Sequence, residues 1–155
     1  MGIALFDDSP LCYLDDFATG LRYRNSFDMM VDAVISSMAA MGHNNLPVIV
    51  AETGWPSSGI DTSAEEDMTF LYSEMFLKGL LAHLRSGSGT PLRKEGLLEV
   101  YVFELVEEEA KGIRNSGLLH HNMTSKYSFE FSDDSKFQAL PEDSKSIWLR
   151  SLWRR

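Results

Sequence analysis

Residues 47–59 read PVIVAETGWPSSG, and the predicted fold class rests mainly on them. Pro47 to Ala51 form a short apolar run without polar alternation, which is typical of a strand covered on both faces in a parallel sheet. The run ends at Glu52, and the Gly- and Pro-rich residues that follow, through Asp61, predict a loop. Because α/β folds place reactive groups at the C-terminal ends of such strands, Glu52 is a candidate functional residue.

Two helical patterns flank this strand. From Phe27 to Met41 apolar residues recur at the spacing of an amphipathic helix, and Gly42 predicts its end. Ser63 to Glu66 has capping-box spacing for a second helix that reaches about His83.

Further strands are predicted from shorter apolar stretches. Ile3 to Phe6 reads as a strand that is followed by a loop through Gly20, and Leu97 to Leu105 as another core strand. Lys126 to Phe131 alternates like an edge strand. Because tens of residues and helical patterns separate the core strands, the predicted class is α/β with a parallel sheet.

The composition excludes several classes of protein. A chain of 155 residues is about one domain, and 44% hydrophobic with 24% charged residues is ordinary globular composition. The net charge of −9 argues against nucleic acid as a partner. No apolar run reaches the roughly 18 residues of a membrane span, and the first residues lack signal-peptide character. Cys12 alone gives no disulfide and four scattered His give no metal-ligand spacing, so we expect no metal and no cofactor.

A carboxylate and an aromatic platform stand close together after the central strand. Trp55 follows Glu52 by three residues and offers a broad apolar face of the kind that stacks on a sugar ring. This pairing suggests a carbohydrate ligand. On the residues alone, Glu52 could equally be a structural cap or a surface ion-pair partner, and Trp55 could serve packing only.

A second acidic cluster follows the next predicted core strand, from Glu104 to Glu109, with Lys111 close behind. The parallel arrangement would bring it to the same rim as Glu52, where crowded like charges raise one another's pKa. The alternative is a solvated acidic face. Elsewhere, Asn122-Met123-Thr124 satisfies a glycosylation sequon, a triplet that also arises by chance.

The central stretch closely resembles the nucleophile motif of plant endo-β-1,3-glucanases, glycoside hydrolase family seventeen. Further segments agree with that family in order and spacing: Ala4-Leu5-Phe6, Leu21 to Asp28 with Val31-Asp32-Ala33, Gly89 to Arg93, Tyr101-Val102-Phe103 and Gly117-Leu118-Leu119. The resemblance runs from about Ile3 to Phe131. Two segments, SEMFLKGL at residues 73–80 and HHNMTSKYSFEFS at residues 120–132, look most like the anther-type branch of the family.

The resemblance implies a (β/α)₈ TIM barrel that cuts internal β-1,3 bonds of glucans with retention of configuration. Glu52 falls on the nucleophile, and Glu108 with Lys111 on accessory positions after the last barrel strand. Glu107 is a rival for the role of Glu108. Contacts to a β-1,3-glucan partner are expected from Trp55, Tyr23 and Glu107.

The resemblance also implies that the barrel is incomplete. Residues 1–131 correspond to about three βα units at its C-terminal end, and the family's general acid lies on an earlier strand without a counterpart here. We therefore expect a fragment that is inactive alone and self-associates through an open sheet edge. Residues 132–155 form a polar, then basic and aromatic tail that we expect to be disordered.

Two other functions remain open on the sequence: a non-catalytic β-1,3-glucan-binding remnant and an acidic protein-interaction module. Relatives in the family are secreted to the cell wall, which implies an extracellular location although no signal peptide is visible.

Overall fold

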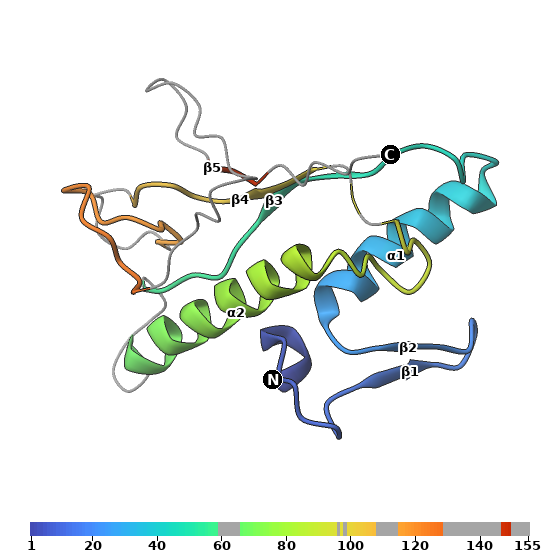
Figure 1. Cartoon of the computed structure of the whole chain (residues 1–155), viewed down its shortest axis with the longest axis horizontal. Helices are drawn as coiled ribbons and strands as arrows, with labels where there is room; N and C mark the ends of the chain where they lie inside the picture. The colour runs from blue at the N-terminus through green and yellow to red at the C-terminus, as the bar shows by residue number, and fades with distance from the viewer. Residues whose placement is uncertain (59–65, 96, 98, 108–114, 129–146, 150–155) are drawn as a thin grey trace.

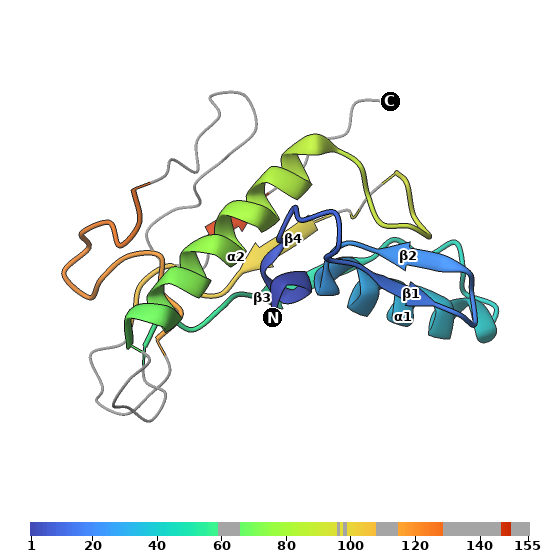
Figure 2. The ribbon, with the colours of Figure 1, turned by 90° about the horizontal axis from the view of Figure 1, so that it is seen from below.

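The structure is a computed structural model that describes residues 1–58, 66–95, 97, 99–107, 115–128 and 147–149. Its elements are the 3₁₀ helix η1 (Gly2–Leu5), β1 (Leu14–Asp16), β2 (Leu21–Tyr23), α1 (Ser26–Ala40), β3 (Ile49–Thr53), α2 (Glu66–Ser86), β4 (Glu99–Val102) and β5 (Ile147–Leu149). β1 and β2 form an antiparallel hairpin, and β3, β4 and β5 form a second sheet in that order. Figures 1 and 2 show α2 across one face of this second sheet.

Helix α1 forms where its apolar spacing predicted it. Asn25 caps its first turn, because the side-chain oxygen accepts a hydrogen bond from the Asp28 N–H at 2.7 Å. Phe27, Val31 and Ile35 are buried along one face. The helix ends before Gly42, whose φ of +83° suits glycine.

Helix α2 ends at Ser86, three residues beyond the predicted end, and its predicted start at residues 63–65 lies outside the described residues. Its own side chains Leu77 and Leu80 are fully buried in the core. Gly79 lets η1 approach closely, since a Cβ there would lie 2.3 Å from the Cβ of Phe6. The core consists of Leu5, Phe27, Val31, Ile35, Phe76, Leu77, Leu80, Leu81, Leu97, Val100, Val102, Leu118 and Tyr127.

The parallel arrangement is confirmed for β3 and β4, which α2 connects as one βα unit. Ile49 pairs with Glu99, Val50 with Val100 and Thr53 with Val102. The predicted strand limits differ: β3 starts two residues later and includes Glu52 and Thr53, and β4 is confined to four residues.

The prediction that β3 is covered on both faces is wrong for the described part of the chain. Ile49 is 50% exposed, and Ala51 and Glu52 are also exposed. Helix α2 covers only one face of the sheet (Figure 2). The apolar run at residues 47–51 therefore does not mean that both faces of β3 are buried here.

The N-terminal segment differs from its predicted strand and loop. Residues 2–5 form η1, because their backbone bonds locally, as in the 2.9 Å bond from the Ala4 N–H to the Met1 carbonyl. The expected loop, which ends at Gly20, contains β1, and β1 pairs with β2 directly after it. The turn between the two strands is held by the Asp16 carboxylate, which accepts hydrogen bonds from Ala18 and Thr19.

The structure describes only part of the predicted edge strand at residues 126–131 and of the tail at residues 132–155. Residues 126–128 form bends rather than an edge strand, and residues 129–131 lie outside the described residues. Of the tail, residues 147–149 form β5, which pairs antiparallel with β4, and the rest of it is not described.

Candidate active site

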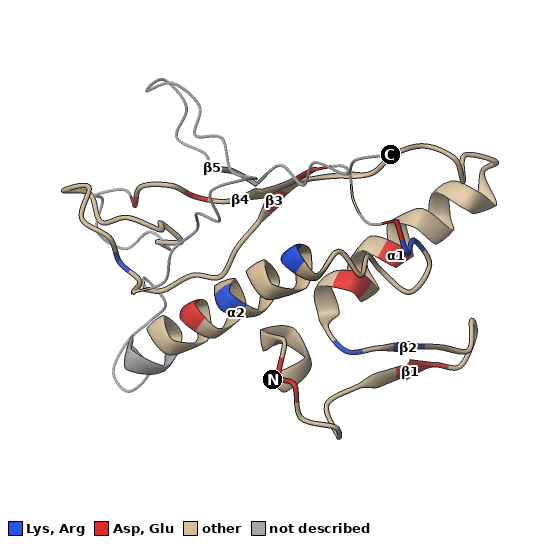
Figure 3. Cartoon of the chain, in the orientation of Figure 1, with Lys and Arg blue, Asp and Glu red and all other residues tan. Residues whose placement is uncertain are grey.

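Glu52 is the fourth residue of β3 and is exposed to solvent. The parallel ladder fixes its backbone, and the Phe103 N–H bonds the carbonyl of its neighbour Thr53 at 2.8 Å. Among the described residues its carboxylate makes no hydrogen bond or ion pair. The side chain is therefore available at the C-terminal end of the strand, and neither a cap nor an ion pair explains it. Acidic residues also occur on β1, α1 and α2 (Figure 3).

The segment after β3 is held against both β4 and α2. A Cβ at Gly54 would lie 2.3 Å from the Phe103 carbonyl oxygen, so only glycine permits this close approach. Trp55 is half-buried and its ring packs on Phe76 of α2, with 5.8 Å between centroids. Its carbonyl accepts a hydrogen bond from the Ser73 hydroxyl at 2.8 Å. The indole is thus fixed close to Glu52 in the chain and keeps part of its surface exposed.

Both carboxylate oxygens of Glu107 contact the segment at residues 115–128. Oε1 lies 2.9 Å from Nδ1 of His120, and Oε2 lies 2.5 Å from Nζ of Lys126. The same ammonium donates to the Ser57 hydroxyl at 2.7 Å, and its side chain is 4% exposed. Ser57 also bonds the backbone of Asn115. We call Ser57, Glu107, His120 and Lys126 the loop brace.

The brace shifts the pKa of its carboxyl group. Burial alone would raise the pKa of Glu107, but hydrogen bonds from Lys126 and His120 outweigh burial and lower it from the ordinary value of 4.5. The carboxylate form is therefore favoured in the folded chain.

We expect the brace to make the chain less stable in acid. Because the folded pKa of Glu107 lies below its unfolded value, its contribution is fully present above the unfolded pKa. It is lost as pH falls through the folded pKa. Urea unfolding at pH 7 and at pH 3 should show a smaller loss of unfolding free energy in Glu107→Gln than in wild type. An equal loss in the two proteins would contradict this prediction.

The segments after β4 and before Leu119 run side by side. Leu118 and Leu119 donate backbone hydrogen bonds to Glu104 and Leu105, at 2.9 and 2.8 Å. A Cβ at Gly117 would lie 2.4 Å from the Glu107 nitrogen, so glycine is required there too. These contacts hold the backbone of Glu107 against the segment at residues 117–119.

Three other predicted site residues remain: Tyr23, Glu108 and Lys111. Tyr23 is 4% exposed; burial, followed by the charge of Asp32, raises its pKa to about 12. Its ring is interior rather than presented to solvent. Glu108 and Lys111 lie outside the described residues. In the part of the chain that is described, no group of His, Cys, Asp or Glu side chains could hold a metal ion.

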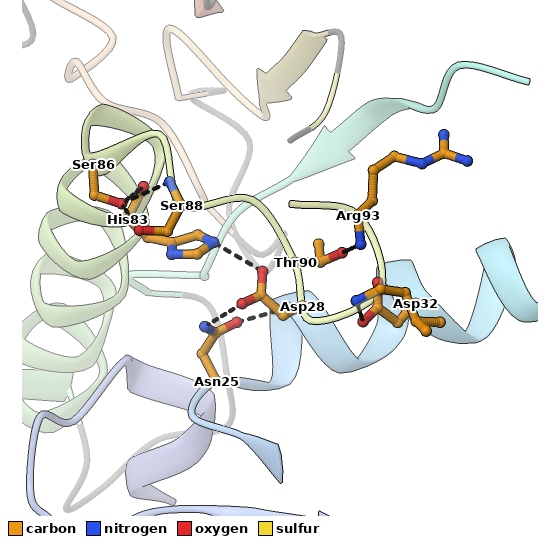
Figure 4. Close-up of polar contacts among 9 residues, drawn as sticks. Asn25, Asp28, Asp32, His83, Ser86, Ser88, Thr90 and Arg93 are labelled. Atoms are coloured by element: carbon orange, nitrogen blue, oxygen red, sulfur yellow. Dashed lines mark hydrogen bonds and ion pairs between the residues drawn. The ribbon is translucent and has the colours of Figure 1, made fainter. Parts of the chain in front are cut away.

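A second polar cluster, which sequence reasoning missed, joins α1 to the end of α2 (Figure 4). Asp28 accepts from the Asn25 amide at 3.0 Å and lies 2.9 Å from Nε2 of His83. Asp32 accepts the Leu92 N–H at 2.9 Å. Arg93 donates to the carbonyls of residues 44 and 46. The cluster is a structural joint. Most of its residues lie in the segments Leu21 to Asp28, Val31 to Ala33 and Gly89 to Arg93, which resemble the family, but the sequence did not show that these segments meet.

No helix within the described ranges combines the length and the apolar character that crossing a membrane requires.

A family model described as "Glycosyl hydrolases family 17" matches residues 4–131. The chain is 38% identical over 142 residues to glucan endo-1,3-beta-glucosidase 4 of Arabidopsis thaliana, covering 88% of this chain and 28% of the relative. It is 33% identical over 161 residues to glucan endo-1,3-beta-glucosidase 8 of the same plant, covering 95% and 32%. The chain therefore spans about a third or less of these curated relatives.

A solved structure is also similar. It is CJP38, a β-1,3-glucanase and allergen of Cryptomeria japonica pollen, with a TM-score of 0.70 and 35% sequence identity. The match covers 85% of this chain and 40% of that chain.

Proposed function

The chain belongs to glycosyl hydrolase family 17, and on that premise we propose that it carries the nucleophile half of an endo-1,3-β-glucanase site. The family and the matched structure imply a TIM-barrel fold. We assign this chain to about three βα units at the C-terminal end of such a barrel, with β3, α2 and β4 as its described βα unit. The substrate is an internal β-1,3-glucosidic bond, and the location is extracellular or in the cell wall.

The position of Glu52 is the observation that carries the proposal. Its carboxylate is exposed at the C-terminal end of β3 without a partner among the described residues, and Trp55 follows on a fixed segment. In a retaining glycosidase such a carboxylate attacks the anomeric carbon and forms a glycosyl-enzyme, which water then hydrolyses. Trp55 would stack on a sugar ring. We assign no proton donor within this chain.

The loop brace bears on the choice between Glu107 and Glu108. Both oxygens of Glu107 are engaged, by His120 and Lys126, so this residue supports the rim rather than contacting substrate. We therefore give the accessory role to Glu108 with Lys111. A contact from Tyr23 to substrate stays a prediction, and the burial of its side chain in this chain does not favour it.

An activated donor tests the nucleophile by itself. A 2-fluoro-β-glucosyl or laminaribiosyl fluoride releases fluoride, a leaving group that needs no proton, so a missing general acid does not stop attack. We expect the full chain to gain one glycosyl mass that tandem mass spectrometry places on Glu52. Binding of a laminari-oligosaccharide without any labelling would contradict the proposal and favour the non-catalytic glucan-binding remnant.

The exposed face of β3 predicts self-association of the isolated chain. β3 is an edge strand within the described sheet, and Ile49 on it is 50% exposed. Light scattering after size exclusion should detect oligomers of wild type and fewer of Ile49→Lys, because a charge on an exposed strand opposes pairing. A monomeric wild type would contradict this prediction.

A further inference from the structure

An exposed turn carries the one Asn-x-Ser/Thr triplet of the sequence, Asn122 to Thr124. The Met123 N–H bonds the His120 carbonyl at 2.8 Å, and the His120 N–H bonds the Thr124 carbonyl at 2.9 Å. All three residues of the triplet are exposed, and Met123 is 63% exposed with a φ of +66°. The triplet is therefore presented at the surface by the folded chain and is not covered by the core.

The side-chain oxygen of Asn122 accepts two hydrogen bonds, and its amide nitrogen remains accessible. Oδ1 accepts hydrogen bonds from the Thr124 N–H at 3.0 Å and from the Thr124 hydroxyl at 2.6 Å. Within the described residues Nδ2 donates no hydrogen bond. An Asn-x-Ser/Thr triplet in a surface turn is the kind of segment that carries N-glycans in secreted proteins.

We propose that Asn122 is an N-glycosylation site of this chain when it enters the secretory pathway. The donor is a lipid diphosphate-linked oligosaccharide. Nδ2 of Asn122 forms a bond to C1 of the first sugar, the bond from C1 to the diphosphate oxygen breaks, the diphosphate leaves with the electron pair, and the amide nitrogen loses one proton. The inference shares the extracellular location with the proposed function but does not depend on hydrolysis.

The glycan would stand beside the loop brace. His120 belongs to the same turn and lies 2.9 Å from Glu107 of the loop brace. A bulky polar group on Asn122 would therefore flank exposed Met123 and solubilise this edge of the molecule without entering the core.

Translation of the full chain behind a cleavable secretion signal, in microsomes, tests the site. Wild type should show one mobility shift that endoglycosidase H removes. Asn122→Gln and Thr124→Ala should lose the shift, whereas Thr124→Ser, which keeps the hydroxyl, should retain it. Asn45→Gln, an exposed asparagine outside any sequon, is the matched control and should keep it.

Three results would overturn the inference: an unshifted wild type while a secreted glycoprotein in the same microsomes is shifted, a shift that survives in Asn122→Gln, or a Thr124→Ser chain as unmodified as Thr124→Ala. Each result is a change in electrophoretic mobility, so it is independent of whether the chain cleaves or binds a glucan.

Discussion

Replacing Glu52 by Gln should abolish covalent labelling by the activated glucosyl fluoride and leave binding of a laminari-oligosaccharide nearly unchanged. Gln has the shape of Glu but carries a neutral amide, which does not attack an anomeric carbon. The labelling rate is expected to fall by at least about 10⁴-fold, the scale on which enzymes lose activity with an essential catalytic group. Intact-mass spectrometry over a time course measures the labelling rates of wild type and of Glu52→Gln.

The fold should tolerate this change. Glu52 is exposed and makes no hydrogen bond or ion pair among the described residues, so no partner is left unpaired. Glu95→Gln is a matched control, because that side chain is 75% exposed and its ion pair with Arg93 is long at 3.6 Å. The Glu95→Gln chain should be labelled at the same rate as wild type. A Glu52→Gln chain that labels as fast as Glu95→Gln would rule out Glu52 as the nucleophile.

The elements that sequence reasoning predicted well depend on local patterns. α1 follows from apolar spacing and from Gly42, both readable within one segment. The β3–α2–β4 order follows from apolar runs separated by a helix, and the parallel pairing bears it out. The segment at residues 2–5 was wrongly predicted as a strand, because an apolar run of four residues does not say whether a neighbouring strand will supply hydrogen bonds.

The candidate site was predictable only where one segment holds it. Glu52 and Trp55 stand three residues apart, so the pairing of a carboxylate with an aromatic platform was visible. The loop brace was not, since Ser57 and Lys126 are 69 residues apart and nothing local marks them as partners. The interior position of Tyr23 depends likewise on how β2 packs.

Lys126→Met is expected to cost about 3 kcal/mol of unfolding free energy, since breaking a buried ion pair from one side leaves an unpaired charge. The ammonium is 4% exposed and the Glu107 carboxylate 12% exposed, so neither charge is well solvated after its partner is removed. His120 remains beside Oε1, which softens the loss, while the Ser57 hydroxyl loses a donor. Urea unfolding monitored by tryptophan fluorescence gives the change in free energy.

The double variant Glu107→Gln with Lys126→Met separates the ion pair from packing. Removing both charges leaves no buried charge unpaired, so the two single losses should exceed the double loss by about 1 to 3 kcal/mol. Lys78→Met is the control, because that lysine is 53% exposed and pairs with Glu74 at the surface of α2, where such pairs are worth under about 1 kcal/mol. Additive single losses would show that the brace is held by backbone contacts such as Ser57 with Asn115, and not by the ion pair.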